Sequence, residues 1–293
     1  MNTRIENFKK SKSYEGQITL REMDEDLSTI SNLDNEAEIQ KKKWTKLLIV
    51  SVVALLLSWF LGPTLGVAQY ALLGASFFLL VTSGVKLFTE GKMDTEDRRY
   101  ELVQEMLKLI SSDIDDGTPL KLHMNLNKPN RKENADGEAS VYGWKVKYYR
   151  DPWLEVRGRF LDGTKFQVMA LEKYQHRSKW KTSASGKKKH KTKTKTATEF
   201  IINLRFKSTR YPNMEALTEK ARGAVKLPSG LLIKSVELSA GQASLRTNTK
   251  TTWHGVESDE PGLNASHGLA SMFLSLYQIL NLSRDTSKRT TQA

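Results

Sequence analysis

A lysine-rich segment between residues 173 and 198 has the residue types and spacing that most clearly predict an interaction. It contains no acidic residue, and it supplies most of the formal net charge of +13 of the 293-residue chain. Alternate side chains of an extended strand point the same way, so Lys191, Lys193 and Lys195 would share one side. We therefore predict a long hairpin that projects from a sheet and attracts anions. The predicted anion-binding residues are Lys179, Lys181, Lys187, Lys188, Lys189, Lys191, Lys193 and Lys195.

Several roles stay open for this segment. As a solvated loop, it would protect a sheet edge from aggregation. Beside a membrane, it would attract anionic lipid headgroups, and an acidic protein would meet the same charges. With a nucleic acid, it would neutralise phosphates in a salt-sensitive way and without base readout, because lysine is a point charge. Tyr174 and Trp180 could stack on bases or lie at a lipid interface, and they could equally be ordinary strand residues.

Residues that commonly perform catalysis form no motif in this sequence. The five histidines lack metal-ligand spacing, and there is no nucleophile elbow, phosphate-binding loop or dinucleotide fingerprint. One weak cluster remains, where His254 and His267 flank Glu257, Asp259 and Glu260. Cysteine is absent, which excludes disulfides and thiolate metal sites. We expect a non-enzymatic protein without a catalytic residue, a cofactor or a metal site.

A long apolar stretch would hold the basic segment near a membrane. No charged side chain occurs from Leu47 to Val85. A single helix over these residues would measure about 58 Å, whereas the hydrocarbon core of a bilayer is about 30 Å thick. The stretch should therefore break, and Gly62-Pro63 predicts the place. We expect a transmembrane helical hairpin over residues 44–88, with spans at about 44–61 and 65–88.

The flanks of the hairpin predict its orientation. Lysines at 41–43 and 46 precede the first span, basic residues including Lys86, Arg98 and Arg99 follow the second, and the bend carries no charge. Basic residues remain on the cytoplasmic side, so both termini of this integral membrane protein should be cytoplasmic. Small residues let helices approach closely in lipid. The predicted packing residues are Ser51, Ala54 and Ser58 in the first span and Ala68, Ala71 and Ala75 in the second.

The remaining sequence predicts an α+β domain with a mostly antiparallel sheet and two or three helices. Alternating apolar residues predict a strand over 120–126, and Asp162-Gly163 between two such runs predicts a hairpin. Strands follow one another without intervening helices, which argues against a parallel sheet. The other expected strands lie at 139–149, 153–161, 165–174, 199–207, 231–238 and 243–251, and the expected helices at 95–112, 213–222 and 265–282.

These observations predict four parts. Residues 1–43 form a polar N-terminal tail, partly disordered to about residue 20, and residues 44–88 form the hairpin. Residues 89–283 form the cytoplasmic domain with the basic loop 173–198, and residues 284–293 form a disordered tail. We expect a membrane-anchored protein that binds anionic lipid or an acidic partner at the cytoplasmic face, with homo-oligomers possible. The alternative is a membrane-tethered, sequence-independent nucleic-acid-binding protein.

Overall fold

The computed structural model describes the backbone at residues 3–66, 68–90, 96–249, 252–259 and 261–292, and the side chains there except at 61–65, 69, 90 and 286–292. The chain divides into two units. The first combines residues 1–27 with 96–293, and the second contains residues 28–95. The fold is α+β, with an eight-stranded antiparallel sheet and six α-helices among the described residues. The predicted fold class is confirmed at this level.

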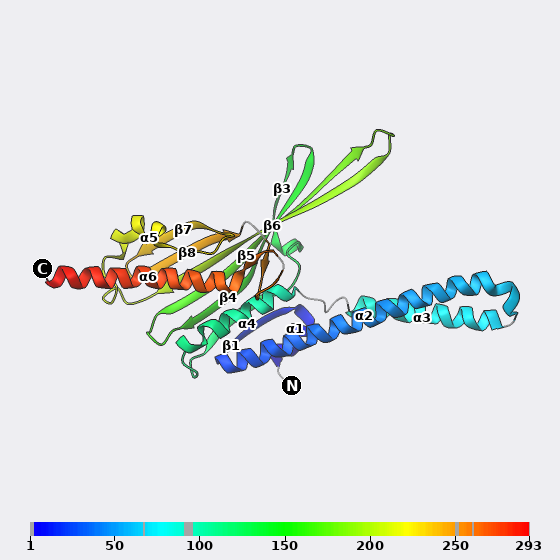
Figure 1. Cartoon of the computed structure of the whole chain (residues 1–293), viewed down its shortest axis with the longest axis horizontal. Coiled ribbons are helices and arrows are strands. Elements are labelled where there is room, and N and C mark those ends of the chain that lie inside the picture. The colour runs from blue at the N-terminus through cyan, green and yellow to red at the C-terminus, as the bar shows by residue number, and fades with distance from the viewer. Residues whose placement is uncertain (1–2, 67, 91–95, 250–251, 260, 293) are drawn as a thin grey trace. The chain divides into compact units, whose positions relative to one another are not determined.

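The sheet of the first unit has the strand order β1-β2-β4-β5-β6-β8-β7, and β3 pairs with β4 beside this path (Figure 1). All of its strand pairs are antiparallel, as the alternating sequence predicts. Two short strands, β9 (Trp253–His254) and β10 (Leu263–Asn264), form a separate parallel pair. The sheet strands are β1 (Ser13–Ile18), β2 (Leu120–Asn125), β3 (Ala135–Val141), β4 (Trp144–Arg159), β5 (Lys165–Thr182), β6 (Lys188–Arg205), β7 (Leu231–Ser239) and β8 (Gln242–Thr249).

Two amphipathic helices cover one face of this sheet. Helix α4 (Asp97–Ile110) contacts α6 (Ala265–Gln292), and α6 also contacts β6 and β8. The ring of Phe273 in α6 meets the rings of Phe160 and Phe166 edge-on. The opposite face is polar, where Asn203 donates to Gln167 and accepts from Ser244. The shorter helical elements are η1 (Ser111–Asp113), η2 (Lys132–Asn134), η3 (Met214–Leu217) and α5 (Thr218–Ala224).

The N-terminal segment differs from the expected partly disordered tail. It forms α1 (Thr3–Ser11), β1 and the first residues of α2, and β1 pairs with β2 over its full length. Tyr14 is fully buried, and its Oη donates to Asp26 Oδ2 at 2.7 Å. Arg4 Nε lies 2.7 Å from the same oxygen. Local sequence composition did not reveal this strand because its partner lies about a hundred residues further along the chain.

The second unit contains most of α2 (Leu20–Leu65) and all of α3 (Ala68–Glu90). Helix α2 continues through Gly62-Pro63, where a break was predicted, and the turn follows at Gly66 with φ +53°. The φ of proline is compatible with a helix, whereas a left-handed glycine is a common helix terminator. Both helices are long and apolar enough to cross a membrane, and only 11% of the apolar window of each is buried.

The predicted packing residues of these helices behave differently in α2 and α3. Ser51 and Ser58 are buried and Ala54 is half-buried. Ala68, Ala71 and Ala75 are exposed, and the buried small residues of α3 are instead Ser76 and Ser83. Each of the four serines donates to a carbonyl of its own helix. Their hydroxyls are therefore satisfied without water, as an apolar environment requires.

Several boundaries in the sheet unit also differ from the prediction. Residues 139–149 are not one strand, because Tyr142 and Gly143 adopt φ +50° and +72° and form the β3–β4 turn. Strand β4 then continues through Pro152, where its register with β5 shifts. The hairpin at Asp162-Gly163 is confirmed. Helix α6 extends to Gln292, beyond the start of the expected tail. Thr95, expected to cap α4, lies outside the described residues, and Glu96 occupies the N-cap position.

Candidate anion-binding surface

Strands β5 and β6 extend past β7 and β8 as a long hairpin, and β4 accompanies β5 as far as Ser178. Their pairing runs without interruption from Lys165↔Arg205 to Thr182↔Lys188, whereas the pairing of β6 with β8 stops at Glu199↔Asn248. The turn is closed by Ser183 N, which donates to the carbonyl of Lys187 at 2.9 Å. Figure 1 shows this hairpin and the shorter β3–β4 hairpin projecting from the same side of the sheet. The hairpin inferred from the basic segment is therefore present.

The pairing register divides the basic residues of the hairpin between two faces. Directly opposed residues in an antiparallel pair point to the same side, and Lys191 opposes Lys179 while Lys189 opposes Lys181. We call the resulting surface the lysine face; it consists of Arg177, Lys179, Lys181, Lys189, Lys191, Lys193 and Lys195. Of the other predicted residues, Lys188 opposes Thr182 on the reverse face, and Lys187 lies in the turn.

The positive charges of the lysine face lie in a segment, residues 173–198, that has no acidic residue. Adjacent β4 contributes Trp144, Val146 and Tyr148 to this side. Lys193 Nζ lies 5.9 Å from the centre of the Trp144 ring. Like charges that oppose each other across strands are destabilising. An anion bound to this face would remove that repulsion.

Lys173, at the base of the hairpin, has a different environment. Its Nζ donates to the buried Glu199 carboxylate at 2.6 Å, and Lys234 of β7 donates to the same oxygen. Burial raises the pKa of Glu199, but the hydrogen bonds from Lys173 and Lys234 outweigh it and leave the pKa below its ordinary value. The charge of Lys173 is thus compensated by Glu199, so we do not count Lys173 in the lysine face although it lies on the same side.

The reverse face of the hairpin carries threonines and aromatic rings. Trp180 opposes His190, with ring centres 4.8 Å apart, and 67% of Trp180 is exposed. Tyr174 lies nearer the sheet and meets Tyr149 edge-on at 5.9 Å. Tyr174 is therefore an ordinary cross-strand residue, whereas Trp180 is a large aromatic side chain with little packing of its own.

A buried ionic cluster, not predicted from the sequence, joins α4 to the sheet. The side chain of Arg99 is fully buried, and its Nη2 lies 2.9 Å from Asp151 Oδ2 and 2.8 Å from Glu172 Oε2. The Arg99 guanidinium also lies over the Trp153 ring, which stacks on Trp253. Arg99 is therefore an internal cross-link between α4 and the sheet. Of the two arginines predicted to flank the apolar helices, Arg98 alone is partly exposed.

The charges of this cluster perturb one another. Burial lowers the pKa of Arg99, but the carboxylates of Glu96, Glu172 and Asp151 raise it to a net value above the ordinary one. Burial raises the pKa of Asp151 despite the nearby guanidinium. A guanidinium that is always charged and flanked by two buried carboxylates stabilises the fold only as a complete set.

Among the residues that the structure describes, the weak histidine cluster is not a metal site. No group of three or more His, Asp or Glu side chains in the described part of the chain could hold a metal ion. His254 packs closely against Gly262, and the backbone N–H of His267 donates to Asn264 Oδ1 at the start of α6. Glu260 lies outside the described residues.

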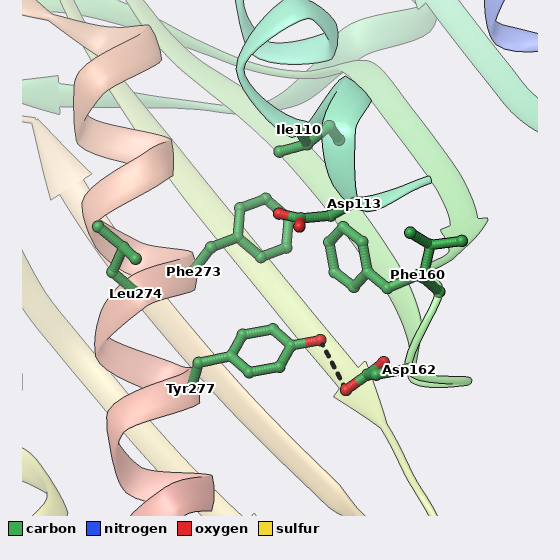
Figure 2. A pocket seen from close by; sticks show the side chains of 8 residues that line it. Ile110, Asp113, Phe160, Asp162, Phe273, Leu274 and Tyr277 are labelled. Atoms are coloured by element: carbon green, nitrogen blue, oxygen red, sulfur yellow. Dashed lines mark hydrogen bonds between the residues drawn. The ribbon is translucent and has the colours of Figure 1, made fainter. Parts of the chain in front are cut away.

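A cavity of about 310 Å³ lies between the end of α4, the turn after β4 and α6 (Figure 2). Phe160, Phe273 and Leu274 give it an apolar wall, and Tyr277 Oη donates to Asp162 Oδ2 at 3.4 Å. Burial raises the pKa of Tyr277, so its hydroxyl remains protonated at neutral pH. Asp162 also accepts hydrogen bonds from the backbone N–H and the hydroxyl of Thr164. The hydroxyl of Tyr277 and the carboxylate of Asp162 are thus used within the fold.

Comparison with protein-family models, with curated proteins and with solved structures gave no match for this chain, so the functional argument depends on its own geometry.

Proposed function

We propose that this chain is a non-enzymatic, membrane-anchored protein whose lysine face binds an anionic surface, either lipid headgroups or an acidic partner. The observation that carries the proposal is the concentration of uncompensated positive charge on one face of the β5–β6 hairpin. Basic side chains near an anionic leaflet contribute about 1 kcal/mol each. A membrane anchor would add to this effect by raising the local concentration of the surface.

Membrane anchoring is supported by the exposed apolar side chains of α2 and α3. Trp59, Phe60 and Phe78 are all more than 60% exposed, and a soluble monomer rarely exposes so large an apolar surface. The pairing of β1 with β2 adds a constraint, because these strands flank the two helices in sequence. Strands of one sheet lie on one side of a bilayer, so the chain between them crosses an even number of times. We propose a two-span hairpin, with both termini on the cytoplasmic side that Lys41, Lys42 and Lys43 favour.

Single-cysteine labelling tests this topology, since the chain has no cysteine of its own. Ala68→Cys, at the start of α3, should react with a membrane-impermeant maleimide only from the non-cytoplasmic side. Ala240→Cys, an exposed position in the β7–β8 turn, should react only from the cytoplasmic side. Labelling of both positions from the same side of an intact membrane would exclude the hairpin.

Lysine footprinting tests the lysine face itself. The full chain, in nanodiscs of phosphatidylcholine with or without phosphatidylserine, would be treated with an amine-acylating reagent and analysed by mass spectrometry. Lys189, Lys191 and Lys193 should lose reactivity in the anionic discs, and added salt should restore it. Lys132, Lys145 and Lys147 provide an internal control, because they are exposed and lie outside both the lysine face and the end of the β5–β6 hairpin. Equal reactivity of the first set in both discs would refute lipid binding.

A matched pair of variants then measures the contribution of the lysine face. The first variant changes Lys189, Lys191 and Lys193 to glutamine, and the second changes Lys132, Lys145 and Lys147. Both remove three charges from exposed positions of the sheet unit. The first should weaken binding of phosphatidylserine vesicles, or of an acidic polypeptide such as polyglutamate, to the full chain in neutral nanodiscs by about 3 kcal/mol. The second should have a much smaller effect, and similar losses would mean that only total charge matters.

A second function, nucleic-acid binding, is favoured by one feature of the lysine face. Trp144 and Tyr148 share this face with the cations, and aromatic rings between basic residues can stack on unpaired bases. Binding of a single-stranded RNA to the full chain in neutral nanodiscs should then weaken steeply with salt. The three-lysine variant of this face should reduce that slope by about 2. Absence of RNA binding at low salt would exclude this function.

A further inference from the structure

The ends of the two projecting hairpins expose aromatic side chains. Tyr142 in the β3–β4 turn is 93% exposed, and Trp180 near the end of β5 is 67% exposed. We call the β3–β4 turn and the end of the β5–β6 hairpin the hairpin apex, here residues 142–143 and 179–189. Elsewhere in the sheet unit the aromatic rings are mostly buried in pairs and clusters, such as Phe160 with Phe166. Exposed rings at the apex therefore need a reason other than packing.

The backbone at Tyr142 strengthens this point. Tyr142 and Gly143 have φ of +50° and +72°, the conformation of a type I′ turn. Asparagine or aspartate followed by glycine is preferred there, and a bulky residue at positive φ is a genuine outlier. Such strain costs of order 1 kcal/mol or more and is characteristic of functional positions. Here the strained residue presents its ring to solvent, so the fold gains no packing in exchange.

Tyr142 and Trp180 lie at the same level of the sheet. Lys145 opposes Ser178, which places the β3–β4 turn beside residues 179 and 180 of β5. Lys179 Nζ donates to the carbonyl of Tyr142 at 3.2 Å and so links the two hairpins. Lys181, Lys187, Lys188 and Lys189 are also part of the apex and are exposed. The apex therefore combines two exposed aromatic rings with a group of exposed lysines.

We infer that the hairpin apex inserts Tyr142 and Trp180 into the interfacial layer of an anionic bilayer while the surrounding lysines contact the headgroups. Tyrosine and tryptophan concentrate at this layer because their rings are apolar at one end and polar at the other. Lipid fits better than nucleic acid, because Trp180 lies on the reverse side of the hairpin from the lysine face. A strand of bases stacked on one face would not reach both Trp144 and Trp180. An apex that enters a bilayer would place the rings of Tyr142 and Trp180 in lipid together.

This inference rests on the proposed function and selects lipid as the anionic surface. The experiment uses full-length variants Tyr142→Cys and Trp180→Cys, each labelled with an environment-sensitive fluorophore and placed in neutral or phosphatidylserine-containing nanodiscs. In the anionic discs both labels should shift to shorter wavelength and become less accessible to acrylamide, a neutral aqueous quencher. A label at Ala240→Cys, at the opposite end of the strands, is the control and should not change.

The outcomes separate this inference from the proposed function. Unshifted labels at positions 142 and 180, together with lysines protected in the footprint, would overturn apex insertion and leave the lysine face as a purely electrostatic surface. Unshifted labels with unprotected lysines would overturn both. A shift caused by RNA and not by anionic lipid would replace lipid with nucleic acid. A further check places the label at Ser183→Cys, near the two rings. The spectral shift of this label in anionic discs should be lost in a Tyr142→Ala/Trp180→Ala variant. It should be kept in a Leu161→Ala variant, which removes an equally exposed apolar residue from the far end of β4.

Discussion

Replacement of Arg99 by methionine should destabilise the sheet unit strongly. Methionine preserves much of the volume of the side chain and removes its charge. The buried carboxylate of Asp151 then loses its cation, and that of Glu172 keeps only the longer contact with Arg98 at 3.4 Å. Removal of one partner from a buried ion pair typically costs about 3–5 kcal/mol. We expect a loss in this range at neutral pH. Arg98→Met is the matched control, because Arg98 is partly exposed and its loss should cost about 1 kcal/mol.

The loss should depend on pH in a defined direction. Burial already raises the pKa of Asp151, so the folded state holds a proton on this carboxyl more tightly than the unfolded chain does. The contribution of Asp151 to the free energy of unfolding is therefore greatest at low pH, and it falls as the pH rises through the raised pKa. Without Arg99 the pKa of Asp151 rises further, so the penalty of the variant should be large at about pH 7 and small near pH 4.

Urea unfolding of the full chain in detergent micelles measures both effects. Tryptophan fluorescence is a suitable signal, because Trp153 and Trp253 stack beside Arg99 and Arg98. A triple variant, Arg99→Met with Asp151→Asn and Glu172→Gln, should recover a large part of the lost stability, since no uncompensated charge remains. A loss below about 1 kcal/mol for Arg99→Met, or a loss that does not change with pH, would refute the description of this cluster as an interdependent set.

Three further predictions concern the sheet unit, and denaturant unfolding of the full chain checks each of them. Tyr14→Phe should cost about 1–3 kcal/mol because it removes the buried hydrogen bond to Asp26, and a change below about 0.3 kcal/mol would contradict that bond. Gly158→Ala should cost about 1–3 kcal/mol, because a Cβ there would lie 2.3 Å from Leu120 and 2.6 Å from Phe166. Its control is Gly223→Ala in α5, which should be neutral or stabilising because the added Cβ meets no atom within 4 Å. Equal effects of the two variants on stability would refute the packing argument. The pKa of Glu199 is lowered, so its contribution to stability is present above about pH 4.5 and is lost as the pH falls through the lowered pKa. Glu199→Gln should therefore destabilise the protein at neutral pH and make its stability less dependent on pH in the acid range. An unchanged pH dependence in that range would be evidence against the Lys173–Glu199–Lys234 pairing.

Local patterns in the sequence were sufficient to predict much of the sheet unit. The alternation around Leu120, the Asp162-Gly163 turn and the amphipathic residues of α6 each depend on neighbours close in sequence, and each element is present. The lysine hairpin was predictable for the same reason, because alternating lysines and threonines fix the side to which each residue points.

Features that depend on distant residues were not predictable in this way. Strand β1 has few apolar residues and acquires its role from pairing with β2. Arg99 looked like one of several basic residues after a membrane span, and only the approach of Asp151 and Glu172 from β4 and β5 makes it a core residue. The break in α2 was placed at Gly62-Pro63 from residue preference alone, whereas Gly66 ends the helix. The two glycines look alike in sequence, and the backbone conformation at Gly66 distinguishes it.

The position of β1 at the edge of the sheet has a consequence for biosynthesis. A ribosome completes β1 before it makes either apolar helix, and it reaches β2 only after both. In the proposed two-span topology, the nascent N-terminal segment, with Phe8 and Tyr14 still uncovered, would wait on the cytosolic side while α2 and α3 insert into the membrane. Delayed insertion of the helices would prolong this interval, so cells that lack chaperones for nascent chains should accumulate the protein in aggregates before the sheet closes.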